Sequence, residues 1–92
     1  MEIIKAEPGW SIVSPWESEE RTVERLEHLP VIAWQLDSDG EDVEVLPITV
    51  EGLEMDADVF RTPEGIYMVP LGGRWSDEAD VVKYFEQRMQ EN

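Results

Sequence analysis

The chain has no cysteine, few basic residues and no long hydrophobic run. Its 92 residues include 22 Asp or Glu but only 7 Lys or Arg and one His, which gives a formal net charge of −15. Without cysteine the chain has no disulfide framework, no zinc site of the cysteine type and no thiol chemistry. Direct binding to nucleic acid is not expected, because it depends on Lys and Arg that displace counterions from the phosphates. The same charge disfavours an anionic membrane surface.

Signals for membrane insertion and targeting are also missing from the sequence. No apolar stretch approaches the roughly 20 residues that a spanning helix needs. The charges of Glu2, Lys5 and Glu7 lie where a signal peptide requires an apolar segment. No lipidation motif is found. We therefore expect a cytoplasmic protein, in agreement with the absence of cysteine.

Aromatic residues are the main indication that the chain folds. Hydrophobic residues make up 41% of the sequence and charged residues 32%, a balance that approaches that of disordered chains. The four Trp, two Tyr and two Phe counteract it, because each buried aromatic side chain removes roughly 150–250 Å² from water. We predict a single domain over residues 1–92, stabilised by added salt that screens its self-repulsion.

Turn residues predict two β-hairpins and one preceding strand. A short strand is expected over 11–14, ending at Pro15. The first hairpin joins 31–36 to 43–48 through an acidic turn that contains Asp39 and Gly40, and Pro47 places its second strand at an edge or a bulge. The second hairpin joins 58–61 to 66–69 through Thr62-Pro63-Glu64-Gly65, with proline and glycine at typical turn positions.

The helical signals are clear at the C-terminal end and ambiguous near residue 20. Ser76 is a natural N-cap, and Val82, Phe85 and Met89 recur at helical spacing, which predicts a helix over 76–90. Residues 18–28 carry a thin apolar stripe and are expected to form either a weak helix or a charged loop. The predicted fold is α+β: a small, mostly antiparallel, hairpin-built sheet with the C-terminal helix packed on one face.

No pattern in the sequence identifies a reaction. The acidic turn that starts at Asp37 does not match a calcium loop, because glycine falls at the fourth position and Ile48 occupies the twelfth. His28, the one histidine, lies in a charged segment and is expected to be solvated. Phosphate-binding, esterase and metalloprotease motifs are missing. We expect no enzymatic activity, no catalytic residue, no cofactor and no metal.

The charge distribution is the strongest functional signal. Between Leu29 and Phe60 the chain has no Lys, Arg or His but nine acids: Asp37, Asp39, Glu41, Asp42, Glu44, Glu51, Glu54, Asp56 and Asp58. The first hairpin and the loop after it should create a one-sided negative field that attracts a basic protein. The candidate interaction residues are Glu41, Asp42, Glu44, Glu54, Asp56, Asp58, Trp10 and Trp16. The same charge also suits a protein that merely stays soluble.

Either Trp10 or Trp16 is expected to be exposed as an interface anchor, whereas Trp34 and Trp75 are expected to be structural. These two candidates flank the short strand over 11–14, each directly after a proline-containing turn.

Four short segments combine apolar residues with turn residues: Ile3–Trp10, Pro30–Trp34, Leu46–Thr49 and Thr62–Gly65. Together they resemble a type of small uncharacterised protein encoded by bacteriophages and prophages. The resemblance implies an accessory protein acting in a bacterial host and brings no known activity. The leading hypothesis is a non-enzymatic module that binds a protein. The alternatives are a DNA-mimic inhibitor of a host nucleic-acid-binding protein and a minor virion or assembly component. The oligomeric state stays open.

Overall fold

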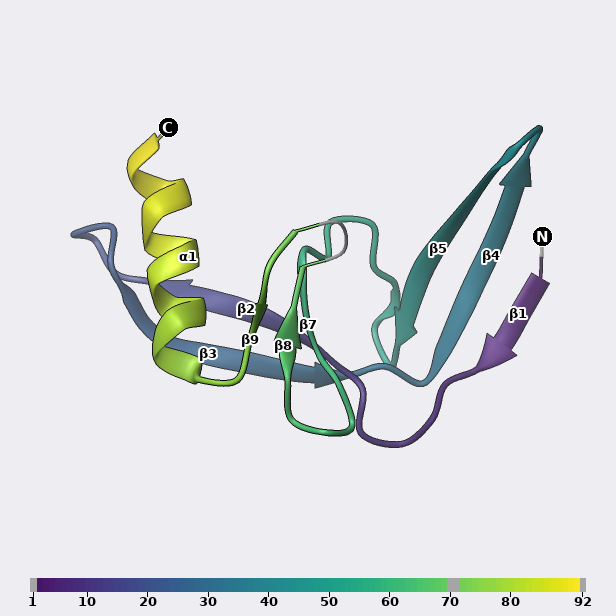
Figure 1. Ribbon diagram of the computed structural model, residues 1–92, viewed down its shortest axis with the longest axis horizontal. Coiled ribbons are helices and arrows are strands. Elements are labelled where there is room, and N and C mark those ends of the chain that lie inside the picture. Colours follow the sequence, from purple (N-terminus) through teal and green to yellow (C-terminus); the bar gives the residue numbers. More distant parts are fainter. Residues whose placement is uncertain (1, 70–71, 92) are drawn as a thin grey trace.

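The computed structural model describes residues 2–69 and 72–91, with Asp39 described by its backbone alone. The described residues form two antiparallel sheets and a C-terminal helix, so the predicted α+β class is confirmed. The molecule is elongated, measuring 41 × 28 × 24 Å. Figure 1 shows the helix and the tip of the first hairpin at opposite ends of the long axis.

The first sheet has the strand order β1-β4-β5-β6. Its strands are β1 (Glu2–Lys5), β4 (Ala33–Asp39), β5 (Asp42–Thr49) and β6 (Gly52–Leu53). The predicted hairpin is confirmed as β4 and β5, and its turn is shorter than the predicted acidic turn. Asp39 pairs with Asp42, which leaves only Gly40 and Glu41 in the turn. Gly40, with φ of 67°, occupies the first central position, where a type II′ turn requires glycine.

The second sheet has the strand order β3-β2-β7-β8-β9. Its strands are β2 (Ser11–Glu17), β3 (Val23–Pro30), β7 (Val59–Arg61), β8 (Tyr67–Met68) and β9 (Arg74–Trp75). The predicted second hairpin is confirmed as β7 and β8. Its turn is closed by a bond from Gly65 N–H to the Thr62 carbonyl (2.9 Å) and one from Thr62 N–H to the Ile66 carbonyl (2.8 Å).

The expectation of a weak helix or charged loop over 18–28 is wrong for its larger part, because residues 23–28 belong to β3. Ser18, a possible helix cap in the sequence, instead closes the β2–β3 turn: its Oγ accepts bonds from Glu20 N–H and Thr22 N–H, both at 3.2 Å. Val23 and Leu26 pack against a core cluster, but they do so as residues of a strand and not of a helix. A serine that bonds to nearby backbone serves a turn as well as a helix.

Pro15 does not end the preceding strand, which continues to Glu17. Pro15 pairs with Leu26 of β3. On its other side β2 pairs with β7 only from Ser11 to Val13. Beyond Val13, β2 is therefore an edge strand, and an edge tolerates a residue without an N–H. Pro47 lies in a comparable place, one residue before the part of β5 that pairs with β6.

The predicted C-terminal helix is confirmed as α1 (Glu78–Glu91), which starts two residues later than expected. Its cap is Asp77 and not Ser76: Asp77 Oδ1 accepts a bond from Ala79 N–H at 3.1 Å. An aspartate in this position also complements the partial positive charge of the helix start. Within residues 2–69 and 72–91, no helix qualifies as a membrane span.

Two clusters of apolar side chains hold the molecule together. In the first, Val81 and Phe85 of α1 pack with Val13, Val59 and Tyr67 of the second sheet. The second cluster lies where the two sheets meet and contains Ala6, Ile12, Val31 and Phe60, with Trp10, Trp34, Ala57 and Met68 against it. The helix therefore covers the second sheet, while most of the β4–β5 hairpin extends beyond both clusters (Figure 1).

Candidate interaction surface

The most distinctive surface belongs to the projecting part of the first sheet, formed by β1, β4 and β5, which we call the arm. The register of its strands assigns side chains to two faces, because successive residues of a strand point to opposite sides. Ile4 pairs with Trp34, and Leu36 pairs with Val45. One side of the arm, the apolar face, therefore carries Ile4, Trp34, Leu36, Val43 and Val45.

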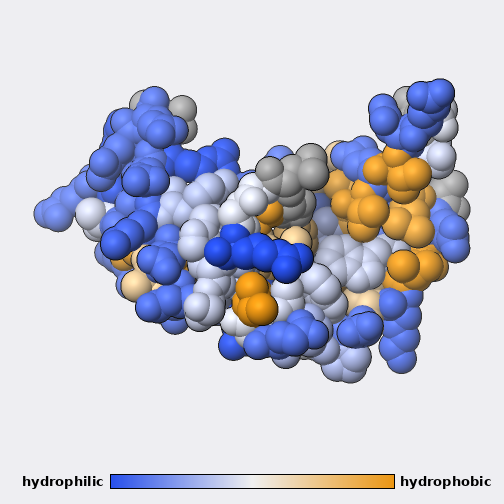
Figure 2. All heavy atoms as spheres, in the orientation of Figure 1, coloured by the Kyte–Doolittle hydropathy of each residue, from blue (hydrophilic) through white to orange (hydrophobic). Residues whose placement is uncertain are grey.

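The apolar face is open to solvent to an unusual degree for side chains of this kind. The exposed fractions are 42% for Ile4, 64% for Val43 and 51% for Val45. Figure 2 shows hydrophobic side chains gathered over β4 and β5, whereas the surface around α1 is hydrophilic. Isolated exposed apolar residues are common, but a contiguous group on one sheet face is characteristic of an interaction site.

A hollow of about 490 Å³ adjoins the apolar face where the arm meets the second sheet. It is lined by Trp10, Trp34, Val43, Glu44, Val45, Phe60 and Met68. Trp10 meets Trp34 edge to face, with ring centroids 5.5 Å apart, and Trp34 also contacts Phe60 at 5.8 Å. These ring contacts fix the wall of the hollow, so its shape exists before anything binds.

The opposite side of the arm, the acidic face, carries Asp37, Asp42 and Glu44. Asp37 lies directly across from Glu44 in the register. Like charges in that position destabilise a strand pair. Gln35 Nε2 donates to Asp37 Oδ2 at 3.1 Å, but no ion pair within residues 2–69 and 72–91 neutralises Asp37 or Glu44. With Glu41 exposed at the turn, the hairpin keeps its negative charge available for a partner.

Glu41, Asp42 and Glu44 are the predicted interaction residues that the structure brings together. Glu54 and Asp56 lie in the connection between β6 and β7, away from the hairpin turn (Figure 1). Glu54 is half-buried, and its carboxylate accepts a bond from Thr49 Oγ1 at 3.4 Å. Asp56 is exposed.

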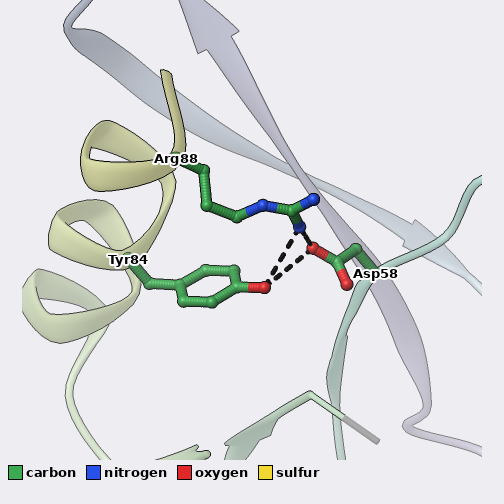
Figure 3. A network of polar contacts seen from close by, with 3 residues as sticks. All are labelled: Asp58, Tyr84 and Arg88. Atoms are coloured by element: carbon green, nitrogen blue, oxygen red, sulfur yellow. Dashed lines mark hydrogen bonds and ion pairs between the residues drawn. The ribbon is translucent and has the colours of Figure 1, made fainter. Parts of the chain in front are cut away.

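Asp58 has a structural position beside the C-terminal half of α1. Its Oδ2 accepts a hydrogen bond from the Tyr84 hydroxyl at 2.9 Å and forms an ion pair with Arg88 (Figure 3). Arg88 Nη1 also donates to the Tyr84 hydroxyl at 3.1 Å. The three side chains connect the helix to the segment that enters β7. The carboxylate of Asp58 is therefore engaged within the fold, apart from the acids of the hairpin.

Of the two candidate tryptophans, Trp10 directly precedes β2 and Trp16 lies near the far end of that strand. Trp10 is half-buried and lines the hollow. Trp16 is 46% exposed, as one of the pair was expected to be. The Arg25 guanidinium lies 4.4 Å from the centre of the Trp16 ring. The Nε1–H of Trp16 donates to Glu27 Oε2 at 3.0 Å. Trp10 belongs to the surface described above, whereas Trp16 is held by β3 near the opposite end of β2.

Sequence reasoning missed Val43, Val45, Phe60 and Met68 as parts of a surface. The alternation of Asp42-Val43-Glu44-Val45 indicates a strand with one apolar side. It does not indicate whether that side is covered, and in most sheets it would be. The signal was present, but only the fold shows that the apolar side of β5 is open.

Nothing in residues 2–69 and 72–91 groups three or more His, Asp or Glu as a metal site. His28 is exposed, and its Nε2 lies 3.4 Å from the Tyr67 hydroxyl. Comparison of the chain with protein-family models, with curated proteins and with solved structures finds no match.

Proposed function

We propose that this protein is a non-enzymatic binding module whose arm engages a basic protein. The observation that carries the proposal is the open apolar face of the arm beside a preformed aromatic hollow. Burying such a surface against a partner removes apolar area from water, which favours association by about 25 cal/mol per Å² before the costs of binding are subtracted. The apolar face of the arm therefore lowers the free energy of a complex that buries it.

The acidic residues of the hairpin have a complementary role in this proposal. Carboxylates around an apolar contact raise the association rate with a cationic partner and exclude anionic ones. Glu41, Asp42 and Glu44 lie on the same hairpin as Val43 and Val45, so charge and apolar contact act on the same partner. In keeping with the phage resemblance, we place this activity in a bacterial cytoplasm.

The experiment that tests the proposal is affinity capture from nuclease-treated bacterial lysate with matched variants. Val45→Glu introduces a charge on the apolar face, and Val50→Glu makes the same change in the β5–β6 turn, where Val50 is 78% exposed. We expect Val45→Glu to lose a basic partner that wild type and Val50→Glu retain. Equal capture by both variants contradicts the proposal, and circular dichroism checks that both are folded.

DNA mimicry is the second candidate function, and it is favoured by the carboxylates of the acidic face, which form no ion pair within residues 2–69 and 72–91. Its test is the variant Glu41→Gln/Asp42→Asn/Glu44→Gln, compared with Glu19→Gln/Glu20→Gln/Glu24→Gln, which removes the same charge from exposed positions around the β2–β3 turn. If the protein is a DNA mimic, DNA should displace its partner and high salt should release it. The variant Glu41→Gln/Asp42→Asn/Glu44→Gln should lose that partner, whereas Val45→Glu should still bind it. A salt-insensitive homo-oligomer would instead favour an assembly component.

A further inference from the structure

We propose that the arm binds its partner by strand addition: a basic, extended peptide segment pairs with the open edge of β5, placing alternate apolar side chains over the hollow. The inference rests on the proposed function, because it takes the arm as the binding surface, and it specifies the partner's chemistry and conformation. Four observations carry it, namely the backbone direction at the edge, the two faces of β5, the hollow and the charge.

The outer edge of β5 has no strand partner along most of its length. β5 pairs with β4 from Asp42 to Ile48 but with β6 only at Ile48 and Thr49. Figure 1 shows this edge of β5 turned away from β4, towards the middle of the molecule. Over 42–46 no other strand of the described chain pairs with it. An edge of this kind is a template for a further strand.

Two hydrogen bonds at the base of β5 establish which backbone groups face the open edge. The carbonyl of Ile48 accepts from Ile32 N–H at 2.8 Å, on the β4 side. The carbonyl of Pro47 accepts from Glu54 N–H at 3.0 Å, on the opposite side. Because backbone direction alternates along a strand, the N–H and C=O groups of Val43 and Val45 point the same way as Pro47. Each presents one donor and one acceptor to an incoming strand.

The two faces of β5 determine which side chains the incoming strand should carry. An added strand continues the pleat, so its side chains alternate between the same two faces. On one face they meet Val43, Val45 and the hollow that contains Trp10 and Trp34. On the other they meet Asp42 and Glu44. The segment that fits both faces alternates apolar residues with Lys or Arg. In this recognition mode the backbone bonds provide affinity and the alternate side chains provide specificity.

Charge decides against a second copy of this chain as the occupant. Pairing β5 with β5 of another molecule would bring Asp42 and Glu44 of both copies onto the same face. Like charges across neighbouring strands destabilise the pair, and charged residues on an edge strand protect against self-association. With a net charge of −15, two copies also repel at long range. A cationic segment removes both penalties.

The test uses a synthetic peptide of about eight residues, a length typical of strands, in which lysine and valine alternate. Binding is measured by fluorescence anisotropy, and amide exchange of the full-length protein is followed by NMR. We expect the N–H groups of Val43 and Val45 to exchange at least about tenfold more slowly with the peptide bound. Glu44, whose backbone already faces β4, should change less. A control peptide in which all the lysines precede all the valines should bind more weakly, because it cannot present lysine to one face and valine to the other along its whole length.

Backbone methylation separates strand addition from side-chain docking. One peptide is methylated on the valine amides and another on the lysine amides, which lie on opposite edges of an extended strand. Strand addition predicts that one of the two loses binding and the other keeps it. On the protein, Val45→Pro removes an edge N–H in the manner of Pro47 and should weaken binding by about tenfold. Val45→Ile, which keeps the N–H, should bind like wild type.

The outcomes distinguish failure of this inference from failure of the proposed function. If the peptide binds but both methylated forms bind equally and Val43 and Val45 exchange as before, the arm binds without strand addition. If no alternating peptide binds while Val45→Glu still loses the lysate partner, the inference falls and the binding module stands. If Val45→Glu also keeps its partner, both fall. If the amide exchange of Val43 and Val45 slows as the protein concentration rises with no peptide present, a second copy of the chain occupies the edge and the inference is overturned.

Discussion

The arm and the helix-covered second sheet each contain a β-hairpin, yet they use their apolar side chains in opposite ways. In the second sheet, Val59 is fully buried and packs with Val81 and Phe85 of α1. In the arm, Val43 and Val45 alternate with acids and remain exposed, and no helix of the described chain covers them. A strand pattern specifies that one side is apolar; only the presence of a covering element decides whether that side is a core or a surface.

The largest effect should come from removing a core side chain on the covered side. Phe85→Ala should lower the free energy of unfolding by about 3–5 kcal/mol, because the ring leaves a cavity between α1 and the second sheet. Val45→Ala, in the arm, should change it by no more than about 0.5 kcal/mol. Urea denaturation of both variants measures the difference. A comparable loss for Val45→Ala would mean that the arm is covered in solution.

The turns and the helix were predictable from sequence, because their signals are local. Gly40 and Gly65 have φ of 67° and 84°, values that glycine adopts without strain, and both hairpins formed where these turns were expected. The spacing of Val82, Phe85 and Met89 gave the helix. In contrast, Val23 and Leu26 of β3 are three residues apart, a spacing that fits a helix better than a strand. The long pairing with β2 overrides that preference, and no local signal reports it.

The candidate site was predictable in its charge and in Trp10, but not in its arrangement. The acids between Leu29 and Phe60 are visible in the sequence, but which of them lie together depends on where the chain leaves the arm. Asp58 falls just before β7 and therefore meets Tyr84 and Arg88 of α1 instead of the hairpin acids. The apolar hollow joins Trp10 to Phe60 and Met68, which lie 50 and 58 positions further along the chain, so only the fold brings them together.

A second difference between the regions lies in how their acids are used. Asp58→Ala should lower the free energy of unfolding by about 1 kcal/mol, since Tyr84 and Arg88 lose a shared acceptor that is partly open to solvent. Asp56→Ala, two residues earlier and exposed, should be close to neutral. Thermal melting compares the two. Equal effects would show that Asp58 contributes charge but no specific contact.

The start of α1 provides a sharper comparison on the covered side. Asp77→Ala should cost about 1 kcal/mol of stability, because the N–H of Ala79 loses its cap. Ser76→Ala should have little effect, although the sequence alone favours Ser76 as the cap. Chemical denaturation monitored by helical circular dichroism decides between the two positions. A larger loss for Ser76→Ala would contradict the cap seen in the structure.

The smallest effect should be a gain of stability in the arm. Glu44→Gln removes the repulsion between Glu44 and Asp37, directly opposite in the register, and should raise the free energy of unfolding by a few tenths of a kcal/mol. Added salt screens the same repulsion, so the gain should shrink at about 0.5 M salt, where the wild-type melting temperature should itself have risen. Glu24→Gln, an exposed acid of β3 opposite no acid of β2 in the register, serves as the control. If Glu44→Gln lost stability instead, the carboxylate would be holding the hairpin together. The acidic face would then be structural, and the free charge that the binding proposal assigns to it would not be available to a partner.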